Sequence, residues 1–240
     1  MLLNGLHDRH SGRVFVLQIG AGGGKTGLPL LPRFREGGWS GLLIEPHPDH
    51  FAALEALHVE SERVAVLNLG VSDISATLAL HALAPEALAG NPRLLRGRAS
   101  LTRDRIAGPG RIDVMSVDVP VLRLDSVLRE LGLDSAQLVV INAGGHEEQV
   151  LRSFDLAALS PGLVFVHVAT GTVVETASLA ALADAGLIPF RIGDWLAGLA
   201  PGALAVPLEE LLSFFNKGIG QTADQKTDLP TDETETGVEE

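Results

Sequence analysis

The sequence predicts an α/β fold in which a mostly parallel sheet carries helices on both faces. Short apolar runs alternate along the chain with amphipathic stretches, which is the pattern of βαβ units. The central apolar runs are continuous rather than alternating, as expected for strands that are buried on both faces. The first of these runs ends in a glycine loop that begins at Gly20, and the second ends at the acid Glu45.

We expect strands at the apolar runs and helices where apolar residues recur at three-to-four spacing. The strands are predicted over residues 14–19, 41–45, 64–68, 137–142, 163–168 and 187–192. Helices are predicted over residues 48–57, 124–131, 146–154 and 173–185, and the last of these ends at Gly186. Residues 203–207 are expected to form a final antiparallel edge strand, and residues 208–215 a closing helix.

Length and composition favour one domain followed by a tail. The chain has 240 residues, of which 46% are hydrophobic, so it can bury one full α/β core, which we place in residues 1–216. Residues 217–240 are rich in acids and threonines and contain almost nothing apolar. Such a segment cannot offset the entropy of ordering, so we expect an acidic disordered tail.

Composition and charge also exclude some classes of function. There is no cysteine, so disulfides, thiolate metal sites and thiolate nucleophiles are excluded. A net charge of -12 argues against nucleic-acid binding by the whole domain, although it leaves room for a local basic patch. No apolar run approaches the ~20 residues of a membrane span, and the first residues do not read as a signal peptide. A cytoplasmic protein is therefore expected.

The glycine loop is compatible with more than one kind of nucleotide-like ligand, since glycine allows a sharp turn and a close approach of the backbone to the ligand. A phosphate-binding P-loop needs Gly, four residues and then Gly-Lys-Ser/Thr. Residues 24–26 supply the end of that pattern, but its first position falls on Ile19. The dinucleotide pattern G-x-G-x-x-G fits residues 22–27 only after a shift of two residues from the end of the strand.

A loop for S-adenosylmethionine fits without a shift, because Gly20-Ala21-Gly22 follows the first strand directly. Glu45 then lies at the end of the second strand, where a nucleoside-binding α/β domain places the acid that contacts the ribose. A glycine turn with no ligand is the alternative. Glu45 weakens it, because an acid that closes a buried strand is costly to desolvate unless something pairs with it.

Two further clusters of residues are candidate sites. His47 and His50 have a spacing that can support metal binding, but no third ligand is evident, so a solvated loop is favoured and no metal is expected. Arginines gather in a segment with many glycines and prolines that reads as a long loop. This segment is either a lid that binds an anionic acceptor through arginine forks, a solvated loop, or a dock for the acidic tail. Its arginines are Arg93, Arg96, Arg98, Arg103, Arg105 and Arg111.

Taken together, the motifs resemble those of the FkbM-type methyltransferases over roughly residues 13–168. The resemblance rests on Gln-Ile-Gly-Ala at 18–21, on Gly-Trp-Ser-Gly-Leu-Leu-Ile-Glu-Pro at 38–46, on Asn-Leu-Gly-Val-Ser-Asp at 68–73, on Leu-Asp at 124–125, and on Ile-Asn-Ala-Gly-Gly-His-Glu at 141–147. It implies a seven-stranded class I methyltransferase fold of Rossmann-like type that uses S-adenosylmethionine. It also implies methyl transfer to a hydroxyl oxygen of a small-molecule acceptor, usually a sugar or secondary metabolite.

By the same resemblance, a set of polar and small residues at the ends of the strands is expected to bind the cofactor. These residues are Gln18, Gly20, Ala21, Gly22, Glu45, Ser72, Asp73 and Asn142. The sequence departs from the family where chemistry is expected, because the usual Asp-x-Glu-Gly after the fourth strand is replaced by Asn-Ala-Gly-Gly at 142–145. The Asn-Asp-Gly that many members have after Gly-Ala is likewise replaced by three glycines at 22–24.

The nearest remaining candidates for a catalytic base are His146 and Glu147, at the start of the helix that follows the fourth strand. A helix N-terminus disfavours the protonated imidazole, so a neutral histidine base is chemically reasonable. The alternative is a surface histidine beside an ordinary first-turn acid. Two functions therefore remain open: an active S-adenosylmethionine-dependent O-methyltransferase with a modified site, or a degenerate methyltransferase fold that serves as a binding or assembly module.

Overall fold

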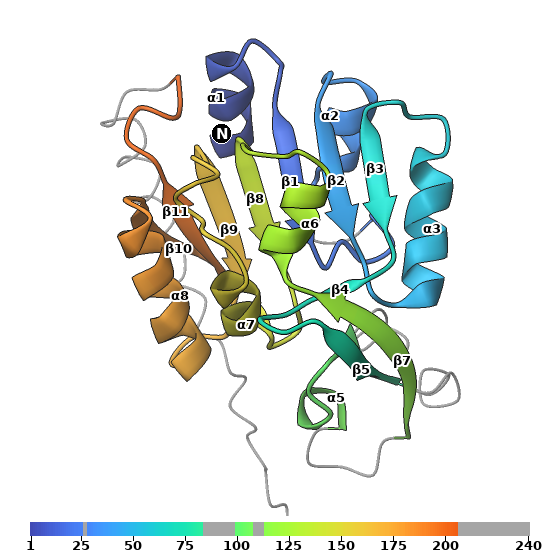
Figure 1. The fold of residues 1–240 in the computed structure, drawn as a ribbon. Coiled ribbons are helices and arrows are strands. Elements are labelled where there is room, and N and C mark those ends of the chain that lie inside the picture. Colours follow the sequence, from blue (N-terminus) through green and yellow to red (C-terminus); the bar gives the residue numbers. More distant parts are fainter. Residues whose placement is uncertain (26–27, 84–98, 108–112, 206–240) are drawn as a thin grey trace, which may run out of the picture. The chain divides into compact units, whose positions relative to one another are not determined.

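The protein forms an α/β unit around one seven-stranded sheet, seen here in a computed structural model that describes residues 1–25, 28–83, 99–107 and 113–205 (Figure 1). Residues 1–204 make up this compact unit. The predicted domain boundary at residues 216 and 217, the acidic tail and the closing helix over residues 208–215 lie outside the described residues. No helix in the described ranges has the length and apolar character needed to cross a membrane.

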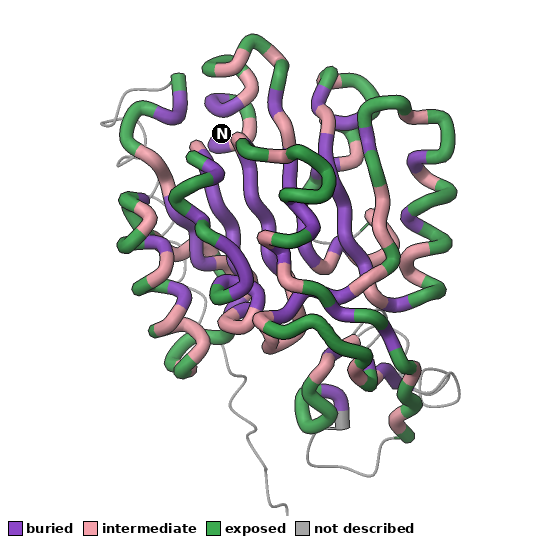
Figure 2. Tube along the Cα trace, viewed as in Figure 1, coloured by how far each residue is buried: buried purple, intermediate pink, exposed green. Residues whose placement is uncertain are grey.

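The main sheet is mostly parallel, as the sequence predicts. Its order is β10(Ile188–Ile192), β11(Trp195–Leu199), β9(Leu163–His167), β8(Leu138–Ile141), β1(Phe15–Ile19), β2(Ser40–Ile44) and β3(Val64–Leu67). β1 lies between β2 and β8 and is parallel to both, whereas β11 is antiparallel to both of its neighbours. The central strands are the most deeply buried part of the chain (Figure 2). Their continuous apolar runs are therefore explained by burial on both faces.

Helices cover both faces of this sheet. They are α1(Leu2–Arg9), α2(Leu31–Arg35), α3(Pro48–His58), α6(Leu124–Glu130), α7(Glu147–Arg152) and α8(Val173–Asp184). Successive side chains of a strand point to opposite faces, so each layer takes alternate residues. Leu17 and Ile19 of β1 pack in a core cluster with side chains of α6, α7 and α8. Leu43 of β2 instead lies with Phe34 of α2 and Leu54 of α3.

A second, smaller sheet was not predicted. It has the order β4(Gly70–Val71), β7(Val114–Leu122), β5(Ala76–Leu83) and β6(Ala99–Ser100), and it lies beyond the carboxyl ends of the main strands together with the short helix α5(Asp104–Ala107) (Figure 1). Leu80, Val119 and Val121 form its small core. Its strands alternate apolar and exposed residues because one face of the sheet is open, which differs from the continuous runs of the main sheet.

The predicted edge strand over residues 203–207 is wrong in its described part, because Ala203, Leu204 and Ala205 are not in a strand. The antiparallel strand is β11, and it lies inside the sheet between β10 and β9. A two-residue turn at Gly193 and Asp194 joins β10 to β11, and Gly193 has a φ of 55°. Such a turn favours glycine and aspartate and makes a tight hairpin, so β11 follows β10 directly.

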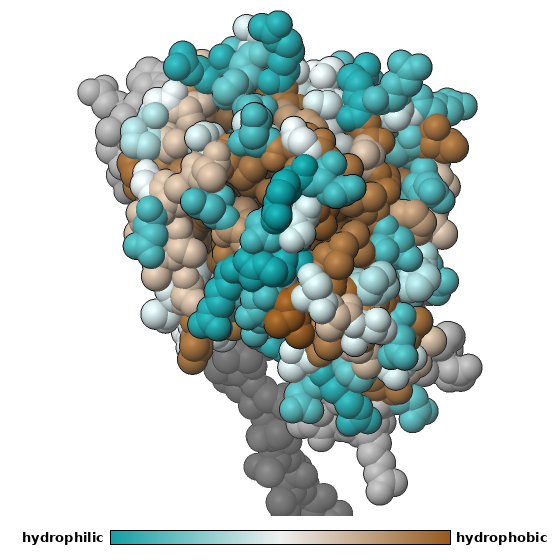
Figure 3. Space-filling model, viewed as in Figure 1, coloured by the Kyte–Doolittle hydropathy of each residue, from teal (hydrophilic) through white to brown (hydrophobic). Residues whose placement is uncertain are grey.

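The face shown in Figure 3 mixes hydrophilic and hydrophobic side chains, and the hydrophobic ones gather between α6 and α3.

Candidate functional site

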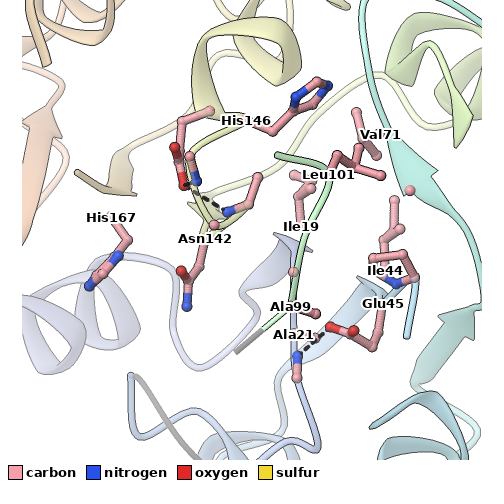
Figure 4. Close-up of a pocket in the computed structure, with 18 of the residues that line it drawn as sticks. Ile19, Ala21, Ile44, Glu45, Val71, Ala99, Leu101, Asn142, His146 and His167 are labelled. Atoms are coloured by element: carbon pink, nitrogen blue, oxygen red, sulfur yellow. Dashed lines mark hydrogen bonds between the residues drawn. The ribbon is translucent and has the colours of Figure 1, made fainter. Parts of the chain in front are cut away.

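A cavity of about 370 Å³ opens at the carboxyl ends of the central strands (Figure 4). Its walls come from the loops after β1, β2, β8 and β9, and from the small sheet through Leu80, Ala99 and Leu101. Chain order reverses at β1, because β2 and β3 follow on one side of it and β8 and β9 on the other. Ligands of open α/β sheets bind at this switch point, so the cavity is the candidate site.

The glycine loop lines this cavity, and its first residue, Gly20, lies where no side chain can be accommodated. Gly20 has a φ of 73°, and a Cβ atom placed on it would lie 2.0 Å from the backbone oxygen of Asn142. The backbone N–H groups of Gly20 and Ala21 both donate to the Ile44 oxygen, at 2.9 and 3.1 Å. Glycine is therefore required at position 20 both by the turn and by the close approach of β8.

Glu45 is buried and holds the glycine loop. Its Oε2 accepts a hydrogen bond from the Gly22 N–H at 2.7 Å, and its Oε1 accepts one from the His47 N–H at 2.9 Å. The side chain points toward the loop that carries Ala21 (Figure 4). Each carboxylate oxygen has a further lone pair, so Glu45 can accept additional hydrogen bonds from a ligand in the cavity. Glu45 therefore lies beside the glycine loop, as its position in the sequence predicts.

Gln18, Gly20, Ala21, Gly22, Glu45 and Asn142 all line the cavity, as do both base candidates, His146 and Glu147. Eight of the ten expected site residues are thus brought together. Ser72 and Asp73 are not among the lining residues, and they lie behind the wall on the side of His146.

His47 and His50 stack on each other beside Glu45, with ring centroids 4.4 Å apart. His50 lines the cavity, and its Nδ1 lies 3.6 Å from Glu45 Oε1. Burial lowers the pKa of His47, and the neighbouring His50 lowers it further. In the described part of the chain, no group of three or more His, Cys, Asp or Glu side chains is arranged to hold a metal ion.

The loop after β8 has lost the acids of the family pattern and is packed tightly in their place. Gly144 has a φ of 63°, and a Cβ atom on it would lie 2.5 Å from the Ala99 backbone oxygen of β6. Ser100 Oγ donates to the Gly144 oxygen at 2.8 Å. The small sheet therefore rests directly on this loop, and a glutamate at position 144 has no room for its Cβ unless β6 moves.

Glu147 supplies a carboxylate to this loop from the first turn of α7. The side chain is buried, and its Oε1 accepts hydrogen bonds from the N–H groups of Ala143 and Gly145 at 3.0 and 3.1 Å. Two charge-assisted hydrogen bonds of this kind fix the course of the loop. Glu147 is therefore more than a first-turn acid facing solvent.

His146 is connected to Asp73 through a serine. His146 Nε2 lies 2.9 Å from Ser72 Oγ, and Ser72 Oγ donates to Asp73 Oδ1 at 3.2 Å. Ser72 is buried, and Arg123 donates to the Asp73 backbone oxygen at 2.9 Å. Burial lowers the pKa of His146, and the nearby Asp73 raises it by less. The imidazole ring extends toward the strand that carries Val71 (Figure 4).

Several lining residues were not predicted from the sequence, among them His167, Asp194 and Trp195, and Arg105 was not distinguished from the other arginines. His167 ends β9 and meets the Trp195 ring edge to face, with centroids 5.0 Å apart. A polar residue at the carboxyl end of a buried parallel strand is a signal that was available for His167.

Fold and site together define a class I methyltransferase-type protein, with a glycine loop after the first strand and an acid after the second. A family model described as the methyltransferase FkbM domain matches residues 18–181. The chain belongs to this methyltransferase family.

A solved structure supports the same fold. The FkbM methyltransferase from Methylobacillus flagellatus matches with a TM-score of 0.50 and 12% identity, over 78% of this chain and 44% of that one. This chain thus spans less than half of that protein. The methyltransferase domain of METTL16 matches with a TM-score of 0.44 and 15% identity, over 83% of this chain and 66% of that one. A precorrin-6y C5,15-methyltransferase from Geobacter metallireducens follows, with a TM-score of 0.41 and 13% identity, over 81% and 87%. Comparison with curated proteins finds no match.

Proposed function

We propose that the protein binds S-adenosylmethionine in this cavity and methylates a hydroxyl oxygen of a small-molecule acceptor. The observation that carries the proposal is the buried Glu45 carboxylate, which is tied to Gly22 of the glycine loop and has acceptor capacity left for a ribose diol. Membership of the methyltransferase family supports it independently.

The residues present fit such a cofactor. Gly20 leaves the loop open to a close approach, and Glu45 faces the position of a ribose. Ile44 and Leu69 supply apolar surface on the same wall, which suits an adenine ring. Asn142, at the end of β8, lies in the cavity (Figure 4), and its side-chain amide has no hydrogen-bond partner among the described residues, so it can donate or accept. When bound, S-adenosylmethionine supplies an electrophilic methyl group on a sulfonium.

The chain's own contribution to the reaction is to orient the acceptor and to remove its hydroxyl proton. His146 is the base in this proposal. The single proton of the Ser72 hydroxyl is donated to Asp73, so His146 Nε2 carries a proton toward Ser72 and Nδ1 keeps its lone pair. Because burial lowers the pKa of His146, the ring is neutral at pH 7, and its Nδ1 can accept the proton of the acceptor hydroxyl.

Glu147 is the weaker candidate for the base. Its Oε1 already accepts two backbone hydrogen bonds, and a proton taken up on that oxygen would disrupt both. We therefore assign to Glu147 the role of holding the loop after β8. Ser72 and Asp73, which the family resemblance places among the cofactor ligands, are reassigned in this proposal to the positioning of His146.

Binding of S-adenosylmethionine to the Glu45→Ala variant tests the proposal. Loss of a charged hydrogen-bond partner should weaken binding by about 1–3 kcal/mol in isothermal titration calorimetry. Glu55→Ala is the matched control, because Glu55 is an exposed acid of α3 outside the cavity, and it should leave the affinity unchanged. Glu45 also holds the loop, so the thermal midpoint of each variant is measured as well, to confirm that it is folded at the temperature of the titration.

A wild-type protein that does not bind S-adenosylmethionine would overturn the proposal, and equal affinity of wild type and Glu45→Ala would overturn the role of Glu45. A protein that binds the cofactor but never converts it with any hydroxyl acceptor would favour the binding-module alternative.

A further inference from the structure

Arg105 is a cationic side chain at the cavity wall. It is the sole arginine or lysine among the described lining residues, and it belongs to α5, next to the small sheet. Among the described residues, its guanidinium has no hydrogen-bond or ion-pair partner. A guanidinium presents five N–H donors in a planar fork, which matches the oxygens of a phosphate or a carboxylate.

The Arg105 side chain lies against the loop after β8. A Cβ atom placed on Gly145 would lie 2.6 Å from Arg105 Nε and 3.0 Å from Cζ, so the guanidinium group occupies space beside a backbone that carries no side chain. The neighbouring Ile106 is buried and lines the cavity too. The contacts of β6 with Gly144 hold the segment that leads into α5 and Arg105.

The described acidic side chains that line the cavity do not pair with Arg105. Three of the described acids line the cavity: Glu45 and Glu147 accept backbone hydrogen bonds from the loops that they hold, and Asp194 lies in the turn between β10 and β11. Leu80, Leu101 and Ile106 line the wall from the same side as Arg105. Arg105 is exposed at this wall, so its guanidinium is accessible to an anion that enters the cavity from solvent.

We propose that Arg105 binds an anionic group, a phosphate or a carboxylate, on the methyl acceptor. This rests on the proposed function, because it assigns the substrate class of the same cavity. Gly145 directly precedes His146, so an acceptor anchored on Arg105 is held on the side of the cavity that contains the proposed base. Among the described residues, no hydrogen bond or ion pair joins Arg105 to the glycine loop or to Glu45, which we assign to the cofactor.

The test compares paired small hydroxyl compounds that differ in charge: glycerol 3-phosphate and glycerate against glycerol. Their binding to the full chain is measured by ligand-observed NMR in the presence of S-adenosylhomocysteine, with wild type, Arg105→Gln and Arg103→Gln. Arg103 is the matched control, since it lies in the same segment, is exposed and does not line the cavity. Wild type should prefer at least one of the two anions by about tenfold or more, the scale of one charge-assisted hydrogen bond.

Arg105→Gln should remove that preference, and Arg103→Gln should keep it. A wild type without a preference, or an Arg105→Gln variant that retains it, would overturn the proposal. The affinity of each variant for S-adenosylhomocysteine is measured separately. If Arg105→Gln weakens it about tenfold as well, the anion is the carboxylate of the cofactor and the acceptor assignment is wrong. Failure of wild type to bind S-adenosylhomocysteine would instead contradict the proposed function. In that case the same comparison of anions, made in the absence of S-adenosylhomocysteine, still tests Arg105.

Discussion

Replacement of Gly144 by alanine tests how tightly the small sheet is built onto the candidate site. An L-residue at a φ near 63° costs about 1–2 kcal/mol in backbone strain. The new Cβ would lie 2.5 Å from the Ala99 oxygen, well inside the 3.0 Å that real Cβ atoms respect, so β6 has to shift. Overpacking of this kind adds about 1–3 kcal/mol. We therefore expect Gly144→Ala to lower the free energy of unfolding by roughly 2–5 kcal/mol.

Gly132→Ala separates the strain from the contact. Gly132 has a φ of 65° but nothing within 4 Å of its Cβ position, so its substitution should cost only the strain, about 1–2 kcal/mol. Both variants are measured by urea unfolding followed by circular dichroism, with the slope of the transition checked for two-state behaviour. If Gly144→Ala is no less stable than Gly132→Ala, β6 does not rest on the loop and the packing described here is wrong.

Other expectations concern the ionisable groups of the site. The pKa of His146 is lowered by burial, so methyl transfer should rise with pH around a midpoint below about 6.5, and His146→Gln should slow it by roughly 10²-fold on the plateau above that midpoint. A midpoint well above about pH 6.5 would argue against this base. Urea unfolding should show Glu147→Gln destabilised by about 1–3 kcal/mol, because it weakens two buried hydrogen bonds, and Glu148→Gln by less than about 1 kcal/mol, because it removes only a surface ion pair. Similar losses in both would refute the buried role of Glu147. The pKa values of His47, His58 and His146 are all lowered in the folded state, so the unfolded chain binds more protons and stability should fall as the pH drops from 7.5 through about 6.5 to 5.5. A free energy of unfolding that stays flat or rises on acidification would contradict this.

The main sheet was accessible from the sequence because its strands are buried on both faces. β1, β2, β8 and β9 read as continuous apolar runs, and burial explains why they must. The small sheet was missed for the opposite reason, since β7 alternates apolar with exposed residues and only its periodicity of two marks it. The antiparallel strand was predicted at the edge of the sheet, over residues 203–207, and not at β11. The place of β11 between β10 and β9 depends on long-range pairing, which local sequence does not encode.

Some residues of the candidate site could likewise be placed from the sequence, and others could not. Glu45 and the glycine loop follow their strands directly, so spacing alone brought them together. The contact between Ser72 and His146 joins residues 74 positions apart and depends on how β4 runs past α7. Arg105 was one of several arginines in its segment, and its place at the cavity became visible only through its contact with Gly145.

A crystal structure of the full chain grown with S-adenosylhomocysteine tests the central claim most directly. We expect the ligand in the cavity at the ends of β1, β2 and β8, with its ribose hydroxyls within hydrogen-bond distance of the Glu45 carboxylate and its chain running along the glycine loop. A ligand bound elsewhere, or one in the cavity whose ribose makes no contact with Glu45, would contradict the assignment of this site.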